Sequence, residues 1–303
     1  MDEIINIDHT YEYEKAIHRE TLHPLVSVID HSENPLIPEH EPFDKKFRYG
    51  YYSIFLKEVK CGDLKYGKNT YDYQEGTLVF MAPGQIVGIS SDGQPREMKG
   101  WVLLFHPDLL LGTPLGRNMK DYSFFSYETN EALHLSEQEK QTVIDCFKKI
   151  RIELQHAIDK HSKMLIVSNI ELLLNYCVRF YDRQFITRSD SNKGVLTKFE
   201  NLLNSYFNSD KPQNIGLPSV KYCANKLNLS SNYFGDLIKK ETGQLAQDYI
   251  QQKLMEVAKE KIHDTDKTVS EVAYELGFKY PQHFTRLFKQ KTGYSPMDYR
   301  QLN

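Results

Sequence analysis

The spacing of apolar residues divides the chain into a strand-rich front and a helical back. Up to about residue 106, short apolar and aromatic segments such as GTLVFMAP and KGWVLLF are separated by Gly, Pro, Asp or Asn. This pattern is typical of a β-sandwich or barrel, so we predict strands over about 20–106. The segment FRYGYYSIFLKEV is apolar or aromatic on both faces, which predicts one strand buried on both sides. An irregular connection is expected from 107 to 135.

After residue 135 the apolar period lengthens from two residues to about 3.6, the period of an α-helix. Ser136 and Glu139 have capping-box spacing, and an apolar stripe follows at helical intervals: Val143, Phe147, Ile150, Leu154 and Ile158. Together with a second helix over about 163–184, this predicts a helical hairpin over about 136–185. The stripe has two interpretations: packing within the domain, or an interface between two copies of the chain.

The polar, turn-rich segment TRSDSNKG predicts a linker at 187–194. We therefore expect a first domain over 1–186 and an entirely helical second domain over 195–303, which gives a two-domain α+β protein. The composition agrees with this division, because 303 residues with 40% hydrophobic and 26% charged side chains describe an ordinary globular protein of about two domains.

An internal repeat lies in the helical part of the chain. Residues 232–250 align with 282–300 at seven identities in nineteen positions, including both residues of a Thr-Gly pair. Each copy consists of a helix with a small Ala inside it, a tight turn, and a second helix that ends at Thr-Gly. Gly directly after a helix is the usual left-handed stop, and helix, short turn, helix is the helix-turn-helix pattern. The chain is therefore predicted to hold two such units.

The second helix of the later copy has an apolar stripe and, opposite it, a polar face of Gln282, Thr285, Arg286 and Lys289. Arg and Gln pair with the edges of guanine and adenine in a major groove, so Gln282 and Arg286 are the candidates for reading bases. Three lysines, Lys279, Lys289 and Lys291, are candidates for contacts with phosphates, and Pro281 suits the first helical turn.

The earlier copy has Asn232, Gly235, Asp236 and Lys239 at the corresponding outward positions. Asn232 suits adenine, whereas Gly235 has no side chain with which to read a base. Phosphates would repel Asp236 unless it accepts a hydrogen bond from a cytosine amino group. Ser230 is a candidate N-cap whose hydroxyl and neighbouring amides also suit a phosphate.

Charge is distributed unevenly around a net value of −3. From Gly194 onward there are 15 Lys and Arg against 12 Asp and Glu, so the back of the chain is basic and the front is acidic. A polyanion is therefore expected at the second domain. The chain has no apolar run of membrane-spanning length and no signal-peptide pattern, so we expect a cytoplasmic protein with no membrane partner. The four cysteines, Cys61, Cys146, Cys177 and Cys223, are too far apart for a disulfide framework or a zinc site, and reduced thiols are expected.

The segments SVKYCANKLNLSSNYFGDLIKKETG and TVSEVAYELGFKYPQHFTRLFKQKTGYSPMDYR resemble the DNA-binding domain of the AraC/XylS family of bacterial transcription regulators. The resemblance covers about 195–302. It implies two helix-turn-helix units held by a linking helix, with recognition helices at about 230–240 and 281–291 that enter successive major grooves. Gly235 and Asp236 depart from the larger or basic residues found in that family, which puts base reading by the first unit in question.

The segment EGTLVFMAPGQIVGI is similar to the cupin-type β-barrel that precedes this domain in many relatives, with Gly76, Pro83 and Gly84 at a turn between strands. Metal-dependent cupins use an HxH pair and a further His, but this chain has no HxH and no His near Val87 or Gly88, so no metal or other cofactor is expected. The histidines, including His23, His40 and His106, are interpreted as surface or structural residues. Six aromatic residues supply either a pocket or a packed core: Tyr49, Tyr51, Tyr52, Phe55, Phe80 and Trp101.

These patterns predict a non-enzymatic regulator of transcription that binds double-stranded promoter or operator DNA. Its cupin-like domain would bind a small-molecule effector, mediate homodimerisation, or do both. An alternative from another class is a metal-free cupin-like sugar-binding protein, or a cupin enzyme, with a tethered nucleic-acid-binding domain. A third is a protein that coats DNA without sequence preference, which the small positive charge of the second domain disfavours.

Overall fold

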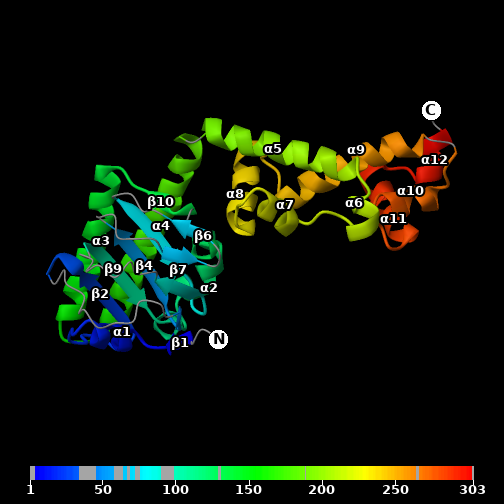
Figure 1. Cartoon of the computed structure of the whole chain (residues 1–303). Coiled ribbons are helices and arrows are strands. Elements are labelled where there is room, and N and C mark those ends of the chain that lie inside the picture. The colour runs from blue at the N-terminus through cyan, green and yellow to red at the C-terminus, as the bar shows by residue number, and fades with distance from the viewer. Residues whose placement is uncertain are drawn as a thin grey trace. The chain divides into compact units, whose positions relative to one another are not determined.

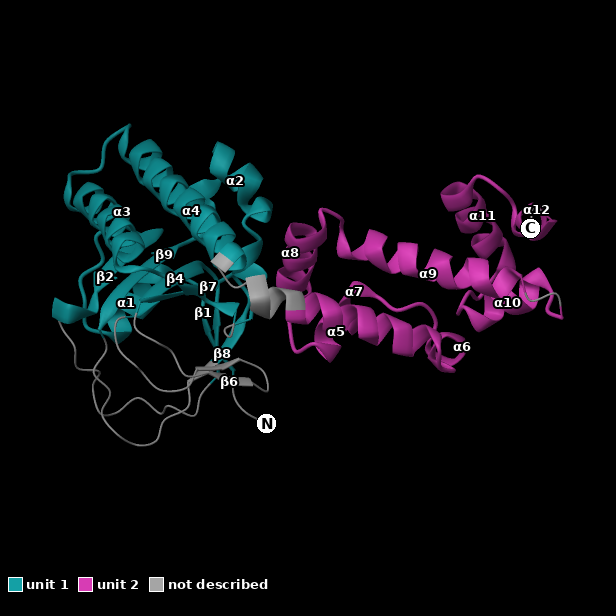
Figure 2. Cartoon of the chain, turned by 90° about the horizontal axis from the view of Figure 1, so that it is seen from above, with its two compact units in different colours: residues 1–187 teal, residues 188–303 magenta. Residues whose placement is uncertain are grey.

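The computed structural model describes residues 4–33, 46–57, 64–66, 69–71, 76–89, 99–128, 131–187, 189–263 and 266–301. The chain divides into two compact units, Met1–Thr187 and Arg188–Asn303 (Figure 2). The first unit contains all the strands of the described residues together with several helices, and the second is helical (Figure 1). The mixed α+β architecture with a helical C-terminal region is therefore as predicted.

The strands of the first unit form two five-stranded sheets. One sheet has the order β1 (Ile4–Ile7), β3 (Lys46–Tyr49), β8 (Ile86–Ile89), β5 (Leu64–Tyr66) and β6 (Asn69–Tyr71). The other has the order β10 (Leu133–His134), β7 (Thr77–Met81), β4 (Tyr52–Lys57), β9 (Gly100–Phe105) and β2 (Val26–Asp30). In the described residues the sheets do not close into the predicted barrel. They also recruit strands from outside 20–106, namely β1 and β10.

The segment predicted as one strand, FRYGYYSIFLKEV, instead forms β3 and β4 in different sheets. The break lies at Gly50, whose N–H donates to the carbonyl of Ile7 at 2.9 Å. A Cβ on this residue would lie 2.7 Å from the carbonyl oxygen of Asp8. A side chain would therefore clash with the chain that leaves β1, and the single-strand prediction was wrong because this close approach is a tertiary contact.

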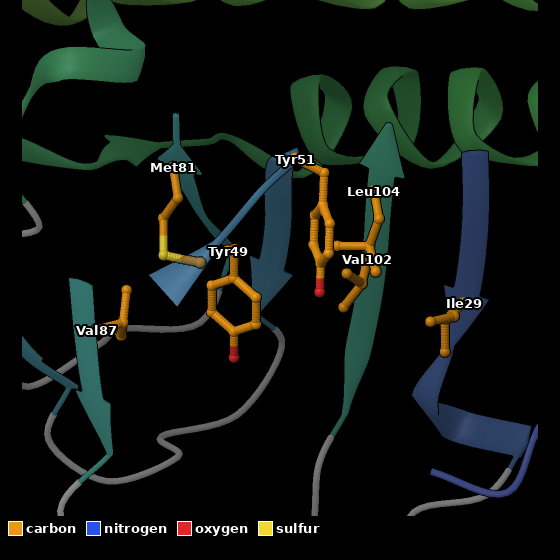
Figure 3. Packing of buried hydrophobic residues seen from close by; sticks show 7 residues of the cluster. All are labelled: Ile29, Tyr49, Tyr51, Met81, Val87, Val102 and Leu104. Carbon is orange, nitrogen blue, oxygen red and sulfur yellow. The ribbon is translucent and has the colours of Figure 1, made fainter. Parts of the chain in front are cut away.

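Apolar side chains from both sheets meet between them (Figure 3). The cluster contains Ile29, Tyr49, Tyr51, Met81, Val87, Val102 and Leu104. Of the six aromatic residues considered from the sequence, Tyr49 and Tyr51 belong to this inner cluster, and Phe55 packs against it. Phe80 and Trp101 point to the other face of the second sheet, where Trp101 stacks on Phe147 with ring centroids 6.2 Å apart.

That outer face is covered by a helical hairpin of α3 (Glu137–Gln155) and α4 (Ser162–Thr187). The predicted capping box is present, since the Glu139 N–H donates to Ser136 Oγ at 3.3 Å. Val143, Phe147, Ile150 and Leu154 are buried, so the stripe packs inside the unit. Ile158 was predicted to continue the stripe, but α3 ends at Gln155 and Ile158 is 68% exposed.

Shorter elements complete the first unit: α1 (Thr10–Ala16), α2 (Pro114–Asn118), and the 3-10 segments η1 (His31–Glu33), η2 (Pro107–Leu110), η3 (Met119–Asp121) and η4 (Ser123–Ser126). His23 and His106 are half-buried and accept hydrogen bonds from the backbone of Leu25 and Asp108, respectively. His40 and Cys61 lie outside the described residues. Cys146, Cys177 and Cys223 are buried free thiols.

The second unit contains α5 (Ser189–Phe207), α6 (Lys211–Ile215), α7 (Val220–Lys226), α8 (Ser231–Thr242), α9 (Ala246–Ile262), α10 (Val269–Glu275), α11 (Pro281–Thr292) and α12 (Pro296–Gln301). The first of these, α5, begins inside the segment predicted as a linker. The central helix, α9, contacts α7 and α8 on one side of the repeat and α10 and α12 on the other. In the described residues, no helix is long and apolar enough to cross a membrane.

Candidate nucleic-acid interface

Two helix pairs in the second unit, α7–α8 and α10–α11, have the same local construction. The first helix of each pair starts at a hydroxyl cap: Ser219 accepts from the Tyr222 N–H at 3.1 Å, and Thr268 accepts from the Glu271 N–H at 3.2 Å. Ala224 and Ala273, the small residues noted in the sequence repeat, are both fully buried. Each pair therefore packs closely where the sequence placed a residue with no side chain beyond Cβ.

The turns between the paired helices also match. Asn228 and Gly277 occupy the same place and have positive φ angles of 56° and 91°. The residue that follows donates its N–H to the buried Ala, from Leu229 to Ala224 and from Phe278 to Ala273, at 3.0 Å in both cases. The two turns thus share one hydrogen-bond pattern.

Both second helices end at the predicted Thr-Gly stop. Gly243 and Gly293 adopt the left-handed conformation and donate to the carbonyls of Lys239 and Lys289, each at 2.9 Å. The preceding threonine hydroxyl donates to the carbonyl four residues earlier, at 2.7 Å in α8 and 2.8 Å in α11. These bonds satisfy carbonyl groups that a helix end leaves without partners.

The outward face of α11 carries the polar side chains singled out from the sequence. Gln282, Arg286 and Lys289 are exposed, and Phe284 and Phe288 on the opposite side are fully buried. Thr285 is half-buried, and its hydroxyl donates to the Pro281 carbonyl at 3.1 Å, which ties it to its own helix. No salt bridge to Arg286 or Lys289 is present in the part of the chain that the structure describes. Both cations are therefore available to an anionic ligand.

Two further lysines flank this face in different ways. Lys279 is exposed in the turn just before α11. Lys291 is also exposed but follows Gln282 by nine residues, which is about two and a half helical turns. The structure therefore places Lys291 on the other side of α11 from Gln282.

The corresponding face of α8 is less basic. Asn232 and Lys239 are exposed, and Gly235 and Asp236 are partly exposed. A Cβ added at Gly235 would meet no atom within 4 Å, so its open side adjoins solvent. Ser230 is the N-cap of α8, as predicted, because its hydroxyl accepts from the Tyr233 N–H at 3.1 Å.

Sequence reasoning missed an aromatic pair at the start of α11. Tyr280 is the N-cap residue, and its ring lies 5.4 Å from that of His283 in an edge-on arrangement. Both side chains are exposed beside Gln282. The available signal was the position of Tyr280 directly before Pro281, where the helix begins. The apolar pattern alone did not distinguish Tyr280 from a residue of the buried apolar stripe.

Comparison with known proteins agrees with this geometry. Residues 223–302 match the family model of a helix-turn-helix domain. The C-terminal region therefore contains a helix-turn-helix domain that is similar to those of the AraC type. An uncharacterised HTH-type transcriptional regulator of Bacillus subtilis, YtdP, is 35% identical over 78 residues, which are 26% of this chain and 10% of that protein.

Two further relatives extend the likeness. The HTH-type transcriptional activator RhaS of Citrobacter koseri is 32% identical over 78 residues, which are 26% of this chain and 28% of that protein. The solved C-terminal domain of the response regulator yesN from Fusobacterium nucleatum is 28% identical, with a TM-score of 0.32, over 35% of this chain and 98% of that one. The curated relatives YtdP and RhaS are transcriptional regulators, and this chain spans under a third of the length of each. The family match lies within the second unit.

Proposed function

We propose that the protein regulates transcription by binding specific double-stranded DNA sequences, with α8 and α11 in successive major grooves. The observation that supports this most directly is the duplicated unit: two helix pairs with equivalent first-helix caps, turns and Thr-Gly stops both contact α9, and each presents one polar helix face. A major groove admits an α-helix, and two such helices read sites about one helical turn apart.

In this proposal α11 reads bases and α8 mainly positions the domain. Arg286 and Gln282 reach base edges, with Thr285 packed beside them, because they share the exposed face. Two lysines, Lys279 and Lys289, contact phosphates on either side of the groove, and Lys291 contributes charge from the far side of the helix. In the first helix-turn-helix unit, α7–α8, the DNA backbone is held by Asn232, Lys239 and the capped helix start at Ser230, whereas Asp236 restricts the sequences that fit.

We assign the first unit a cupin-like sensor role with no cofactor. Its two sheets face each other across a cluster that contains Tyr49 and Tyr51, an arrangement suited to enclosing a small molecule. A ligand changes DNA occupancy only if it binds one arrangement of the chain better than another. Within the first unit, Gln184 near the end of α4 joins this helix to the segment of β10, since it accepts from the His134 N–H at 2.8 Å and donates to the Ala132 carbonyl at 3.2 Å.

A homodimer through the first unit is part of the same proposal. The stripe on α3 is buried within the unit and is unavailable for this purpose, but α4 has exposed apolar residues on its outer side: Met164, Leu165, Leu172 and Val178. Leu165 and Leu172 are seven residues apart and so lie on one face. Two copies would place four helix-turn-helix units on repeated half-sites and raise affinity through effective concentration. The regulatory classification of the relatives favours a non-enzymatic, cytoplasmic role.

Selection of bound sequences from random duplex DNA, with the full chain as bait, tests the proposal. We expect two enriched blocks whose centres lie about 10 base pairs apart, as for helices in successive grooves. The double substitution Gln282→Ala with Arg286→Ala should remove the block read by α11 and leave the other block. Enrichment of no sequence at all would contradict specific recognition and favour non-specific coating of DNA.

A further inference from the structure

Besides His31, three buried polar side chains in the described part of the first unit have atoms without hydrogen-bond partners. They are Glu14 on α1, Tyr51 in the turn between β3 and β4, and Ser53 on β4, with exposed fractions of 4%, 0% and 1%. The unpartnered atoms are Glu14 Oε2, the Tyr51 hydroxyl and Ser53 Oγ. Unpartnered polar atoms in a protein interior are rare, and each requires an explanation.

The three side chains gather around Leu104 on the inner face of the second sheet. Leu104 pairs with Ser27 on one side and with Ser53 on the other, so both serines point to the same face as Leu104. Glu14 reaches this face from α1 and accepts a hydrogen bond from Ser27 Oγ at 2.5 Å. Tyr51 packs beside Leu104 in the cluster of Figure 3. We call Glu14, Ser27, Tyr51 and Ser53 the inner polar patch.

The inner polar patch contains the carboxyl group of Glu14 but no basic side chain. Burial raises the pKa of Glu14, with hydrogen bonds and Arg19 acting against it. The Arg19 guanidinium, however, donates to the carbonyl of Asp30 at 2.7 Å and to the Glu33 carboxylate at 3.3 Å rather than to the Glu14 carboxylate. An unpaired buried carboxylate is costly, and each neutral polar group without a partner costs about 1–3 kcal/mol. A cation with hydrogen-bond donors would lower the cost for each of these groups that it contacts.

Aromatic rings border the same place. Tyr49 and Tyr51 have ring centroids 5.4 Å apart at an angle of 44°, and Tyr13 from α1 packs against the same cluster. Tyrosine faces attract organic cations by cation–π interaction. A carboxylate oxygen, two hydroxyls and several tyrosine rings within one apolar cluster match an ammonium group attached to a small hydrocarbon body.

We propose that the inner polar patch binds the ammonium group of a small organic amine, and that this amine is the effector class of the sensor role proposed above. Glu14 Oε2 accepts from the ammonium, Tyr51 and Ser53 accept from its remaining N–H groups, and the apolar part lies against Leu104 and Val102. An alcohol of the same shape supplies fewer donors and no charge, so it leaves the Glu14 carboxylate without a counter-ion.

Binding of isosteric probe pairs to the full chain tests this at pH 7 without DNA. Phenethylamine and butylamine are compared with phenethyl alcohol and butanol by titration calorimetry and thermal unfolding. We expect both amines to bind and to raise the unfolding temperature, and the alcohols to do neither. Equal binding of amines and alcohols would overturn the amine assignment, and binding of neither would indicate that water alone fills the patch.

Substitutions localise the binding. Glu14→Gln keeps the shape and removes the charge, so amine binding should weaken at least about ten-fold, whereas Glu20→Gln, an exposed carboxylate, should leave it unchanged. If Glu14→Gln fails to fold, Ser53→Ala and Tyr51→Phe replace it, and each should weaken amine binding several-fold. Unchanged affinity in all folded variants would overturn the proposal. Because amine binding is measured without DNA, a failure of DNA recognition would leave this result interpretable.

Discussion

The two helix-turn-helix units differ in chemistry but hardly in construction. Both have a hydroxyl cap, a buried Ala, a left-handed turn residue and a Thr-Gly stop with equivalent hydrogen bonds. Their outward faces have diverged, with Asp236 where the other unit has Arg286, and Gly235 where it has Thr285. The comparison teaches that internal packing and backbone hydrogen bonds fix the fold of each helix pair. The exposed positions are not constrained in this way, so the two outward faces can differ in what they bind.

One framework position also differs in its surroundings. Gly277 lies against α6, where a Cβ would be 2.7 Å from the Pro212 carbonyl oxygen and 2.9 Å from the Gly216 carbonyl carbon. Asn228, its counterpart, is exposed and carries a full side chain. The helix pair α10–α11 is thus held against α6 at a place where the pair α7–α8 faces solvent.

The largest effect is expected from Gly277→Ala. The left-handed conformation costs Ala about 1–2 kcal/mol and the backbone clash adds to it, so we expect a loss on the order of 2–4 kcal/mol in unfolding free energy. Asn228→Ala meets only the conformational cost and should lose about 1 kcal/mol. Urea unfolding of the full chain measures both. Equal losses would mean that the contact with α6 does not distinguish the units.

Arg286→Ala should have the next largest effect, now on DNA binding. Loss of a base contact costs about 1–3 kcal/mol for the selected site and relaxes specificity at that position. Asp236→Ala, the matched change on α8, should leave the specificity for the DNA block read by α11 unchanged. Competition between selected and scrambled duplexes measures both variants. If Arg286→Ala weakens both duplexes equally, Arg286 contacts phosphate and α11 does not read sequence through it.

Lysine substitutions should have smaller, sequence-independent effects. Lys289→Ala and Lys239→Ala occupy equivalent positions, and each should lower affinity on all duplexes and reduce the salt-dependence slope by about 1. Lys291→Ala should change the slope less, because Lys291 lies on the other side of α11. Titrations at several salt concentrations give the slopes. A larger change for Lys291 than for Lys289 would indicate that α11 docks through a different face.

The smallest expected effect is a gain in stability. Gly235→Ala introduces a better helix former into open space, so we expect unfolding free energy to rise by about 0.5–1 kcal/mol. Gly243→Ala is the contrasting control, because its φ of 74° requires the left-handed conformation and the change should destabilise α8. Thermal unfolding measures both. Destabilisation by Gly235→Ala would show that the helix needs Gly at this position for packing.

Sequence reasoning succeeded where the determining interaction is local. The caps at Ser136 and Ser230, the stops at Gly243 and Gly293, and Pro281 at the first turn of α11 depend on residues within four positions of each other. Amphipathic spacing likewise identified Phe284 and Phe288 as buried. The position of Lys291 on the other side of α11 also follows from helical spacing, whereas its charge alone made it a candidate for a phosphate contact.

It failed where distant segments meet. A glycine inside a strand pattern indicates a bend or a close approach, but no local signal shows that the obstacle at Gly50 is the backbone of Asp8 at the end of β1. The pairing of β10 with β7, and its attachment to Gln184, join segments about fifty residues apart. The apolar stripe on α3 was correctly found, but its length was overestimated at Ile158 because the helix end depends on the following turn.

The sequence by itself determined the caps at Ser136 and Ser230, the stops at Gly243 and Gly293, the repeat and the residues of each polar face, since these follow from backbone hydrogen bonding and periodicity within a few residues. Only the tertiary structure decided which buried groups remain without partners. Glu14, Tyr51 and Ser53 come from separate elements, and their incompatibility with an apolar interior appears only once two sheets and α1 enclose them. Burial is a property of the folded whole, because it depends on every segment that excludes water from the site.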